Sequence, residues 1–452
     1  MKKVFLIVCI ISISSNFAQE HFGGISTSSR VGILNTLNNP AEFANLSKKI
    51  EVNVFGLSLN VANNKIGFSD LTSDTNLEDL IFKGTEPVNM SVNAELIGPS
   101  VAFHWQKWGF GVTTKAMAKF DLVDIDSQLG NAIKNNSVSF INSPLISNNY
   151  NQRMFGTSWG EVGLSAARTL FENDKNRINV GLTLKFLFPG SYSNFGVDKF
   201  QGSIIYVGQQ AYLTNTHAAL NFSYSGSLAD SFTNFDDYSK SVFGNLDGVA
   251  TDFGINYQRK DGNKKYKLNA GFAVRNIGSM TFKDNNNYAT NYELNIQPTV
   301  ANPNGLNLSV FNGTNSDNLN QIEKVLLQSG YLNKTVANKT EFKVKLPTVF
   351  SAYLDLKLVP KLYVSLYTQQ KLNSNNNNDQ ITAQNIVSIT PRLNLGFFET
   401  YTSWSKNEIS GVNGGLGFRL GGFYIGSNSI ITALINDSKQ ADFYTGFRFA
   451  ML

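Results

Sequence analysis

The stretch Val180-Gly181-Leu182-Thr183-Leu184-Lys185-Phe186 decides the fold of this chain. In an extended segment its valine, leucines and phenylalanine share one face, whereas its glycine, threonine and lysine share the other. A side-chain period of two indicates a β-strand, and one apolar face opposite one polar face suits a strand between lipid and water. The same alternation recurs along most of the 452-residue chain, in segments of about ten residues. The sequence therefore predicts an all-β protein whose strands cross a membrane.

The clearest alternating segments are residues 50–60, 88–105, 108–120, 155–170, 177–188, 216–227, 251–259, 266–277, 342–358, 361–371, 381–393, 395–404, 412–420, 422–429 and 442–449. Lys260-Asp261-Gly262-Asn263 predicts a tight turn between two of them, and the asparagine run 375–378 before Asp379 predicts a longer loop. Single-chain bacterial barrels have an even number of strands. We therefore expect that some of these segments belong to one strand and that one further strand is not recognised in the sequence. We expect a transmembrane antiparallel β-barrel of about 14 strands with short helical inserts.

Three inserts have helical rather than extended spacing. Two sets of residues each share one helical face: Leu122, Ile125, Leu129 and Ile133, and Leu319, Ile322, Leu326 and Ser329 before a capping Gly330. A weaker pattern covers residues 232–242. Such helices either pack over loops or fold into the barrel mouth as a lid, and the sequence leaves both possibilities open.

The N-terminus has the three-part layout of a secretory signal peptide. Met1-Lys2-Lys3 precedes an apolar run over residues 4–13, and polar residues lead to Ala18. The run is shorter than the roughly 20 residues of a membrane-spanning helix. We predict a signal peptide at 1–18, an N-terminal segment and possible plug at 19–49, and one barrel domain at 50–452, located in the cell outer membrane. The single cysteine, Cys9, lies inside the signal, so the exported chain should have no disulfide or thiolate site.

Composition excludes several classes of function. Charged residues make up 16% of the chain, against roughly 25% in soluble domains. The net charge of +5 includes no basic block, so nucleic acid is not an expected partner. His104 and His217 have no neighbouring acid or nucleophile motif, and histidines are too few for a closed metal site. We predict no enzyme activity, no metal and no cofactor; an exported soluble β-protein such as a propeller is the competing class.

Short motifs near both ends resemble known barrels. Asn38-Asn39-Pro40-Ala41 resembles the Asn-Pro-Ala element near the N-terminus of FadL-type fatty-acid transporters and PorV-like barrels, and residues 252–257 (DFGINY) resemble their strand pattern. Residues 414–423 (GGLGFRLGGF) are similar to closing hairpins of uncharacterised Bacteroidota outer-membrane barrels. Residues 444–449 (YTGFRF) look like the last strand that barrel assembly machinery recognises, although three residues follow. The resemblance implies that Asn39, Pro40 and Ala41 belong to a plug.

The apolar register places a mainly cationic set of side chains inside the barrel: Lys115, Glu161, Lys185, Arg275, Asp355, Lys357, Arg392, Arg419 and Arg448. A net positive lumen would attract a carboxylate or another anionic head group. The same cations would alternatively pair with acids and fill a narrow barrel. These alternatives make different predictions about an open path through the lumen.

Two functions remain after these observations. The FadL resemblance implies passage of hydrophobic or amphipathic solutes, with a hydrophobic or anionic amphiphilic ligand in the lumen. The PorV resemblance implies a docking or structural partner for cell-surface or secretion machinery, with a protein partner on its loops. Outer-membrane lipid is a partner in both cases. A solute pocket would favour passage, whereas a sealed lumen with ordered loops would favour docking.

Overall fold

The computed structural model describes residues 20–28, 30–70, 77–135, 145–225, 244–261, 266–283, 286–311, 319–435 and 437–451. The predicted signal peptide and the predicted helix at 232–242 lie outside the described residues. Within these ranges, no helix is long and apolar enough to cross a bilayer.

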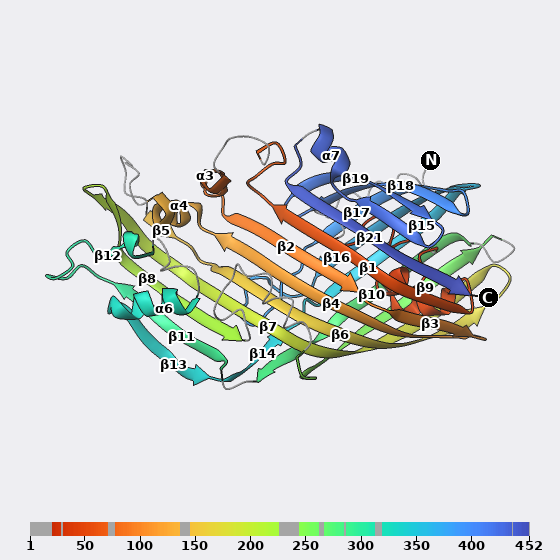
Figure 1. Cartoon of the computed structure of the whole chain (residues 1–452), viewed down its shortest axis with the longest axis horizontal. Coiled ribbons are helices and arrows are strands. Elements are labelled where there is room, and N and C mark those ends of the chain that lie inside the picture. Colours follow the sequence, from red (N-terminus) through yellow and green to blue (C-terminus); the bar gives the residue numbers. More distant parts are fainter. Residues whose placement is uncertain are drawn as a thin grey trace, which may run out of the picture.

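A ring of 14 strands in one antiparallel sheet forms the body of the molecule (Figure 1). Around the ring, each paired with the next, lie β1 (Ile50–Asn63), β2 (Val88–Ile97) with β3 (Ser100–Trp105), β4 (Trp108–Ile125), β6 (Asn151–Glu172), β7 (Asn176–Val207), β9 (Gly248–Lys260), β10 (Tyr266–Lys283), β14 (Glu341–Lys345) with β15 (Val349–Val359), β16 (Leu362–Lys371), β17 (Ile386–Asn394), β18 (Phe398–Asn407), β19 (Gly411–Leu420), β20 (Phe423–Ser427) and β21 (Gln440–Met451). The last strand closes the ring against the first, pairing Met451 with Ile50. The predicted barrel of about 14 strands is therefore confirmed.

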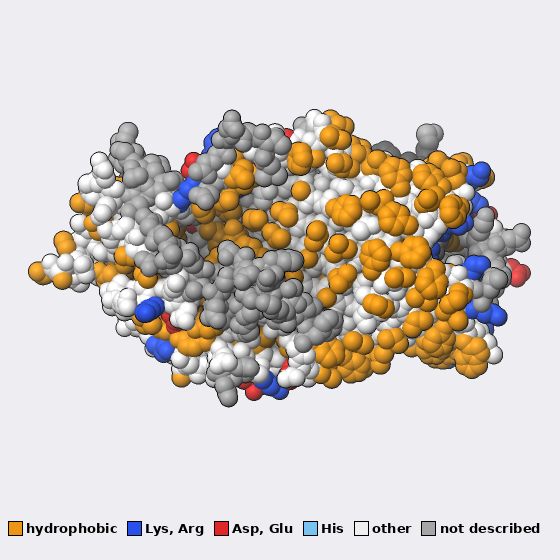
Figure 2. Space-filling view, in the orientation of Figure 1, with side chains coloured by type: hydrophobic (Ala, Val, Ile, Leu, Met, Phe, Trp, Pro, Cys, Tyr) orange, Lys and Arg blue, Asp and Glu red, His pale blue; other side chains and the backbone are white. Residues whose placement is uncertain are grey.

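The two faces of the ring have the polarity that residues 180–186 predict: apolar outside and polar inside. Along the first half of β7, Leu182 and Leu184 are 52% and 37% exposed on the outer face. Thr183 and Lys185 alternate with them and are buried inside. Figure 2 shows apolar side chains spread over the visible outer face of the ring, with Lys and Arg at the end near the termini and again toward the opposite end. An apolar outside and a polar inside are typical of strands that separate lipid from a lumen.

The two ends of the ring differ in the length of their connections. The end that holds Ile50 and Met451 has short turns at 106–107, 173–175, 360–361, 395–397 and 421–422. Gly421, with φ of 60°, begins one of these turns in a conformation that glycine adopts without strain. The described parts of the longer connections 64–87 and 126–150 lie at the opposite end, together with the connection 372–385 and one short turn at 408–410. We call these the short-turn end and the long-loop end.

The same sheet continues beyond the ring at the long-loop end. The second half of β7 pairs with β8 (Gln210–Ser225), β8 with β11 (Tyr288–Ile296), and β11 with β13 (Leu332–Lys339); β5 (Leu145–Ser147) and β12 (Leu306–Asn307) add short edges. We call this part the extension sheet. The segment that the sequence predicted as a ring strand, at 216–227, has its described residues in β8 of the extension sheet, and they do not form part of the ring. The buried face of β8 packs into an apolar core rather than facing a lumen. Strands β11 and β13 lie outside the predicted segments.

Helices cover the extension sheet. Its core includes residues of α4 (Ser127–Asn135), α6 (Leu319–Gln328) and η4 (Leu308–Phe311). The predicted helical set at 319–329 is placed in α6, which is followed by Gly330 with φ of 75°. The other predicted set is only partly helical, because Leu122 and Ile125 remain in β4, paired with β2. The remaining helices are α2 (Ile33–Thr36), η1 (Pro40–Asn45), α3 (Leu77–Ile81) and α7 (Ile430–Ile435).

A buried carboxylate fastens α6 to the extension sheet. Glu323 accepts hydrogen bonds from Tyr288, at 2.6 Å, and from Tyr292. Burial raises the pKa of the Tyr292 hydroxyl to about 12, so this hydroxyl remains a donor at neutral pH. Lys334 lies over both tyrosine rings, 5.7 and 5.4 Å from their centroids. The helix is thus held by polar contacts as well as by its apolar face.

Candidate functional site

The N-terminal segment lies inside the ring and fills its short-turn half. Ile25, Val31 and Ala41 are fully buried there. Helix η1 contacts β3, β4, β6, β7 and β9, which form one continuous part of the wall. This is the part of the chain in which we expected a plug.

A row of small residues in the wall makes room for η1. Across five adjacent strands, the paired positions are Gly109, Ala167, Gly181, Gly254 and Ala273. A Cβ atom on Gly109 would lie 1.9 Å from the carbonyl oxygen of Phe43, and one on Gly181 would lie 2.3 Å from the carbonyl carbon of Pro40. Any larger side chain in this small-residue row would displace the backbone of η1.

Asn39, Pro40 and Ala41 form the start of η1 against this row. The Asn39 Oδ1 atom accepts a hydrogen bond of 2.9 Å from the Ala41 backbone N–H, which caps the helix. Its Nδ2 atom donates to the carbonyl oxygen of Ile255 in the wall at 2.9 Å. Pro40 occupies an early helical position, where no N–H is needed. One asparagine side chain therefore both starts the helix and attaches it to the ring.

Glu42 anchors the same helix in the lumen. The sequence analysis did not identify it as a lumen residue. Its carboxylate accepts hydrogen bonds from Asn45 at 2.8 Å, from Asn269 at 2.9 Å and from Asn256 at 3.0 Å, and also from the Tyr353 hydroxyl. A buried carboxylate without enough donors is strongly unfavourable, and these neutral donors solvate it. The strand alternation places Asn256, Asn269 and Tyr353 on the inner face of neighbouring strands. This cluster of inward hydrogen-bond donors was the signal in the sequence that could have predicted a buried acceptor.

Several predicted lumen residues form an ion-pair network near the middle of the ring. Glu161 lies 3.6 Å from Lys115 and 3.8 Å from Lys185. Lys115 also approaches Glu95 at 3.7 Å, and Lys185 forms a closer pair with Asp252 at 2.9 Å. The structure thus brings Lys115, Glu161 and Lys185 together on one side of the lumen.

A second network lies toward the short-turn end. Arg392 pairs with Asp355 at 2.7 Å and with Glu399 at 3.5 Å, and Arg419 reaches the same Glu399 at 3.5 Å. Glu399 is the cross-strand partner of Arg419, so strand pairing alone would have located this acid. The network fills space inside the wall rather than lining an open path.

The remaining predicted cations occupy three different settings. Arg448 pairs with the buried Glu51 at 3.0 Å. Lys357 keeps the inward register but lies near the short-turn mouth, where it pairs with Asp261 of a neighbouring turn at 2.5 Å. Arg275 donates to Leu37, Tyr367 and Gln369 and has no carboxylate partner among the described residues. Most of the predicted lumen cations are therefore paired with acids, and they do not form a positive surface.

A loop folds into the lumen from the long-loop end. Residues 372–385, which we call the inward loop, include the predicted asparagine-rich loop, and residues 380–384 are buried. The strand predicted at 381–393 begins only at Ile386 for this reason. Arg153 donates to the carbonyl oxygens of Asn375, at 2.5 Å, and Gln380, at 3.1 Å. The Tyr192 hydroxyl donates to the carbonyl oxygen of Asn378 at 2.6 Å.

The inward loop and the N-terminal segment meet inside the ring. The Gln384 backbone N–H donates to a Glu20 carboxylate oxygen at 3.1 Å. Lys119 of the wall lies 3.8 Å from the same carboxylate and donates to the carbonyl oxygen of Thr382 at 2.9 Å. One insert enters from each end, and the two inserts are in contact inside the lumen.

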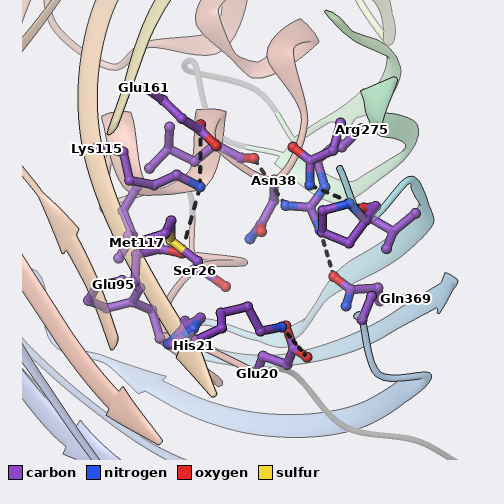
Figure 3. A pocket seen from close by; sticks show the side chains of 18 of the residues that line it. Glu20, His21, Ser26, Asn38, Glu95, Lys115, Met117, Glu161, Arg275 and Gln369 are labelled. Atoms are coloured by element: carbon purple, nitrogen blue, oxygen red, sulfur yellow. Dashed lines mark hydrogen bonds and ion pairs between the residues drawn. The ribbon is translucent and has the colours of Figure 1, made fainter. Parts of the chain in front are cut away.

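A cavity of about 100 Å³ remains between the N-terminal segment and the wall (Figure 3). Lys115 and Glu161 lie on one side of it and Arg275 and Gln369 on the other, with Asn38 between them. Apolar side chains complete the lining: Phe22, Leu34, Leu37, Met117, Trp159, Pro347 and Val349. Among the described residues, no group of three or more His, Cys, Asp and Glu side chains is arranged to hold a metal. The cavity can bind a small polar or amphipathic group.

Fold and lumen together define the class: a closed transmembrane β-barrel whose polar interior is filled by two inserts of its own chain. Residues 40–428 match the model of a family described as "Family of unknown function (DUF5723)". The chain belongs to this family. No curated protein matches the sequence significantly.

Solved structures with a similar architecture are distant in sequence. A "TodX monoaromatic hydrocarbon channel deltaS2 mutant" is 9% identical with a TM-score of 0.48, over 94% of this chain and 95% of that chain. The Pseudomonas putida toluene transporter TodX is 9% identical with a TM-score of 0.43, over 96% and 98%. A Pseudomonas aeruginosa FadL homologue is 10% identical with a TM-score of 0.42, over 96% and 98%. These values are too low to transfer a function.

Proposed function

We propose that the protein resides in a bacterial outer membrane and passes hydrophobic or amphipathic solutes through its ring. Bacterial barrels have short periplasmic turns and longer outer loops, so the short-turn end faces the periplasm and the long-loop end faces outward. Residues 1–18 are then the export signal, and residues 19–49 act as the periplasmic plug. The resemblance to PorV-like and Bacteroidota barrels stays a prediction from the sequence.

The observation that carries the proposal is the pair of inserts that meet inside one lumen beside a cavity. A barrel that only held itself together could be filled by side chains of its wall. In this protein the N-terminal segment and the inward loop occupy the lumen instead, and neither is a strand of the ring; the loop has a single bridge to it, between Gln380 and Lys345. The movement of two inserts, without any break in the ring, would connect the two ends.

The inward loop has the contacts of an insert that can leave. Its attachment to Arg153, Tyr192 and Lys119 is by hydrogen bonds to its backbone carbonyls. The bonds from the charged donors Arg153 and Lys119 contribute about 1.5–3 kcal/mol each and the bond from Tyr192 about 0.5–1.5 kcal/mol, because water replaces each partner when the loop moves out. Both inserts also have apolar contacts: Phe22, Ile25 and Leu34 of the plug pack with tyrosines of the wall, and Ile381 of the loop is buried in a cluster with Phe155 and Trp159. The plug buries more apolar side chains than the loop does. The loop is therefore the easier of the two to open.

A disulfide between the inward loop and the wall tests whether the loop gates the lumen. Lys345 and Gln380 are bridge partners, so we would replace both with cysteine in a chain whose exported part has no other. In planar lipid bilayers, oxidation should suppress conductance events and reduction should restore them, while each single-cysteine variant responds to neither. Replacing residues 375–383 with two glycines should raise conductance. If none of these variants changes conductance, the loop is not a gate.

Mass spectrometry of the protein purified from outer membranes in mild detergent tests passage of solutes directly. A retained amphiphile in stoichiometric amount supports the proposal. A stable protein companion with no retained lipid would replace it with the docking alternative, for which the structure and the comparisons provide no support.

A further inference from the structure

The cavity beside the plug holds three buried polar atoms that have no hydrogen-bond partner among the described residues. They are Arg275 Nε, Asn38 Nδ2 and His21 Nε2, and all three residues line the cavity. Buried donors are normally paired, because an unpaired one loses its hydration without replacement. Two of the three are obligatory donors. Their convergence on one cavity indicates an occupant that supplies acceptor oxygens.

The ion pairs around the cavity indicate where an anion would bind. Its three acids each lie near a lysine: Glu95 and Glu161 share Lys115, Glu161 is also near Lys185, and Glu20 is near Lys119. Arg275, across the cavity from Lys115, contacts only neutral groups of Leu37, Tyr367 and Gln369. The one lining cation without an acidic partner among the described residues is therefore Arg275, next to the free amide donor of Asn38.

The rest of the cavity lining limits the size and polarity of the ligand that carries the anionic group. Leu34, Leu37 and Val349 add apolar surface to the cavity. Its volume of about 100 Å³ would hold several water molecules or one carboxylate with a short apolar neighbour. A carboxylate matches a guanidinium in both charge and geometry, which makes it the preferred partner of an arginine.

We propose that this cavity is a carboxylate-binding site in which Arg275 Nε and Asn38 Nδ2 donate to the ligand. The inference deepens the proposed passage of amphipathic solutes and rests on it for its biological role. The carboxylate is either a small free acid or the head group of a longer amphiphile, and the chemistry at Arg275 is the same for both. Because Asn38 belongs to the plug and Arg275 to β10, the ligand bridges them and stabilises the plugged state.

Calorimetric titration of the full-length protein in detergent tests the site without any transport. The probes are sodium acetate, sodium octanoate and octylamine, which has the tail of octanoate without its carboxylate. We expect saturable binding of a carboxylate and none of octylamine. Equal binding of acetate and octanoate identifies a small free acid as the ligand, whereas binding of octanoate alone identifies the head group of an amphiphile.

Variants of the two donors locate the binding. Arg275→Gln should weaken carboxylate binding about 10- to 100-fold, because it removes a charged hydrogen-bond donor. Asn38→Ala, which leaves every wall residue in place, should weaken it severalfold and serves if Arg275→Gln fails to fold. Lys357→Gln removes a cation at the short-turn mouth, away from the cavity, and should leave the affinity unchanged.

Two results would overturn the inference. One is the absence of saturable carboxylate binding, which would mean that water satisfies these donors. The other is an affinity unchanged in both Arg275→Gln and Asn38→Ala. Carboxylate binding without conductance from either loop variant would remove the proposed passage and leave the site. Conductance without carboxylate binding would do the reverse.

Discussion

The two halves of β7 have opposite polarity although they belong to one continuous strand. In the ring, the buried side chains of residues 179–185 of β7 are polar, such as Thr183 and Lys185, and the exposed ones are apolar, such as Leu184. In the extension sheet, Phe200 and Ile204 are buried and Gln201 is exposed. The inversion shows that the two halves face different solvents. The ring arranges its residues for lipid outside, and the extension arranges them for water outside.

Phe200→Ala should have the largest effect, and only on the extension. It removes a fully enclosed ring from an apolar core, at a cost of about 3–5 kcal/mol. We expect rapid proteolysis of the extension while the ring keeps its heat-modified mobility on gels. Lys199→Ala, on the exposed side of the same segment, is the matched control and should behave as wild type. Loss of ring assembly in Phe200→Ala would mean that the halves fold as one unit.

Leu184→Arg tests the lipid-facing half. An arginine on the outer face near the bilayer midplane costs about 2–4 kcal/mol, so yield in the membrane fraction should fall sharply. Gln201→Arg places the same side chain on the exposed face of the extension half and should assemble normally. Equal assembly of the two variants would show that Leu184 does not meet lipid.

Gly181→Val tests the inward face of the ring half. The added methyl groups would collide with Pro40 of η1, at a cost of about 1–3 kcal/mol. The ring should still assemble, but the N-terminal segment should become accessible to protease from the short-turn end. Ala166→Val adds methyl groups to the outer face of the neighbouring strand, opposite Leu182, and should leave the segment protected. A protected segment in Gly181→Val would contradict the fit described for the small-residue row.

Tyr292→Phe should have the smallest effect. It removes one hydrogen bond to Glu323, worth about 0.5–1.5 kcal/mol, without emptying the core. Hydrogen exchange in α6 should accelerate, and exchange in the ring strands should not change. Tyr212→Phe, whose hydroxyl contacts only the exposed Gln210, should alter neither. Unchanged exchange in α6 would show that its apolar face alone holds it.

The sequence predicted the ring well because lipid imposes a rule on every second residue. It predicted the extension poorly for the same reason. Strand β13 is exposed on nearly all its residues and so has no alternation to detect. Residues 381–385 were assigned to a strand because a buried, partly apolar stretch satisfies the same pattern when it lies inside a lumen. An alternating pattern of apolar residues shows that a segment is buried, but it does not distinguish a strand of the wall from a loop inside the lumen.

The sequence predicted which side chains of the wall face the lumen, but not how the N-terminal segment packs against them. Strand register placed Lys115, Glu161 and Lys185 inside, where the structure has them. Glu161 and Asp355 were also predicted inside, and they pair with predicted cations. Other neutralising acids were overlooked, among them Glu399, which lies directly across from Arg419. Asn38 and Glu20 could not be placed at all, because both lie on a segment without strand periodicity. Their positions depend on how that segment packs in three dimensions.

The continuity of β7 also has a mechanical consequence. A domain joined through a flexible tether can swivel and leaves its neighbour undisturbed when it is pulled. By contrast, the 32 residues of β7 run without interruption from the ring into the extension (Figure 1). They pair with β6 and β9 in the ring and with β8 in the extension. A force applied to the part outside the membrane would therefore be transmitted as shear along the hydrogen bonds of the wall.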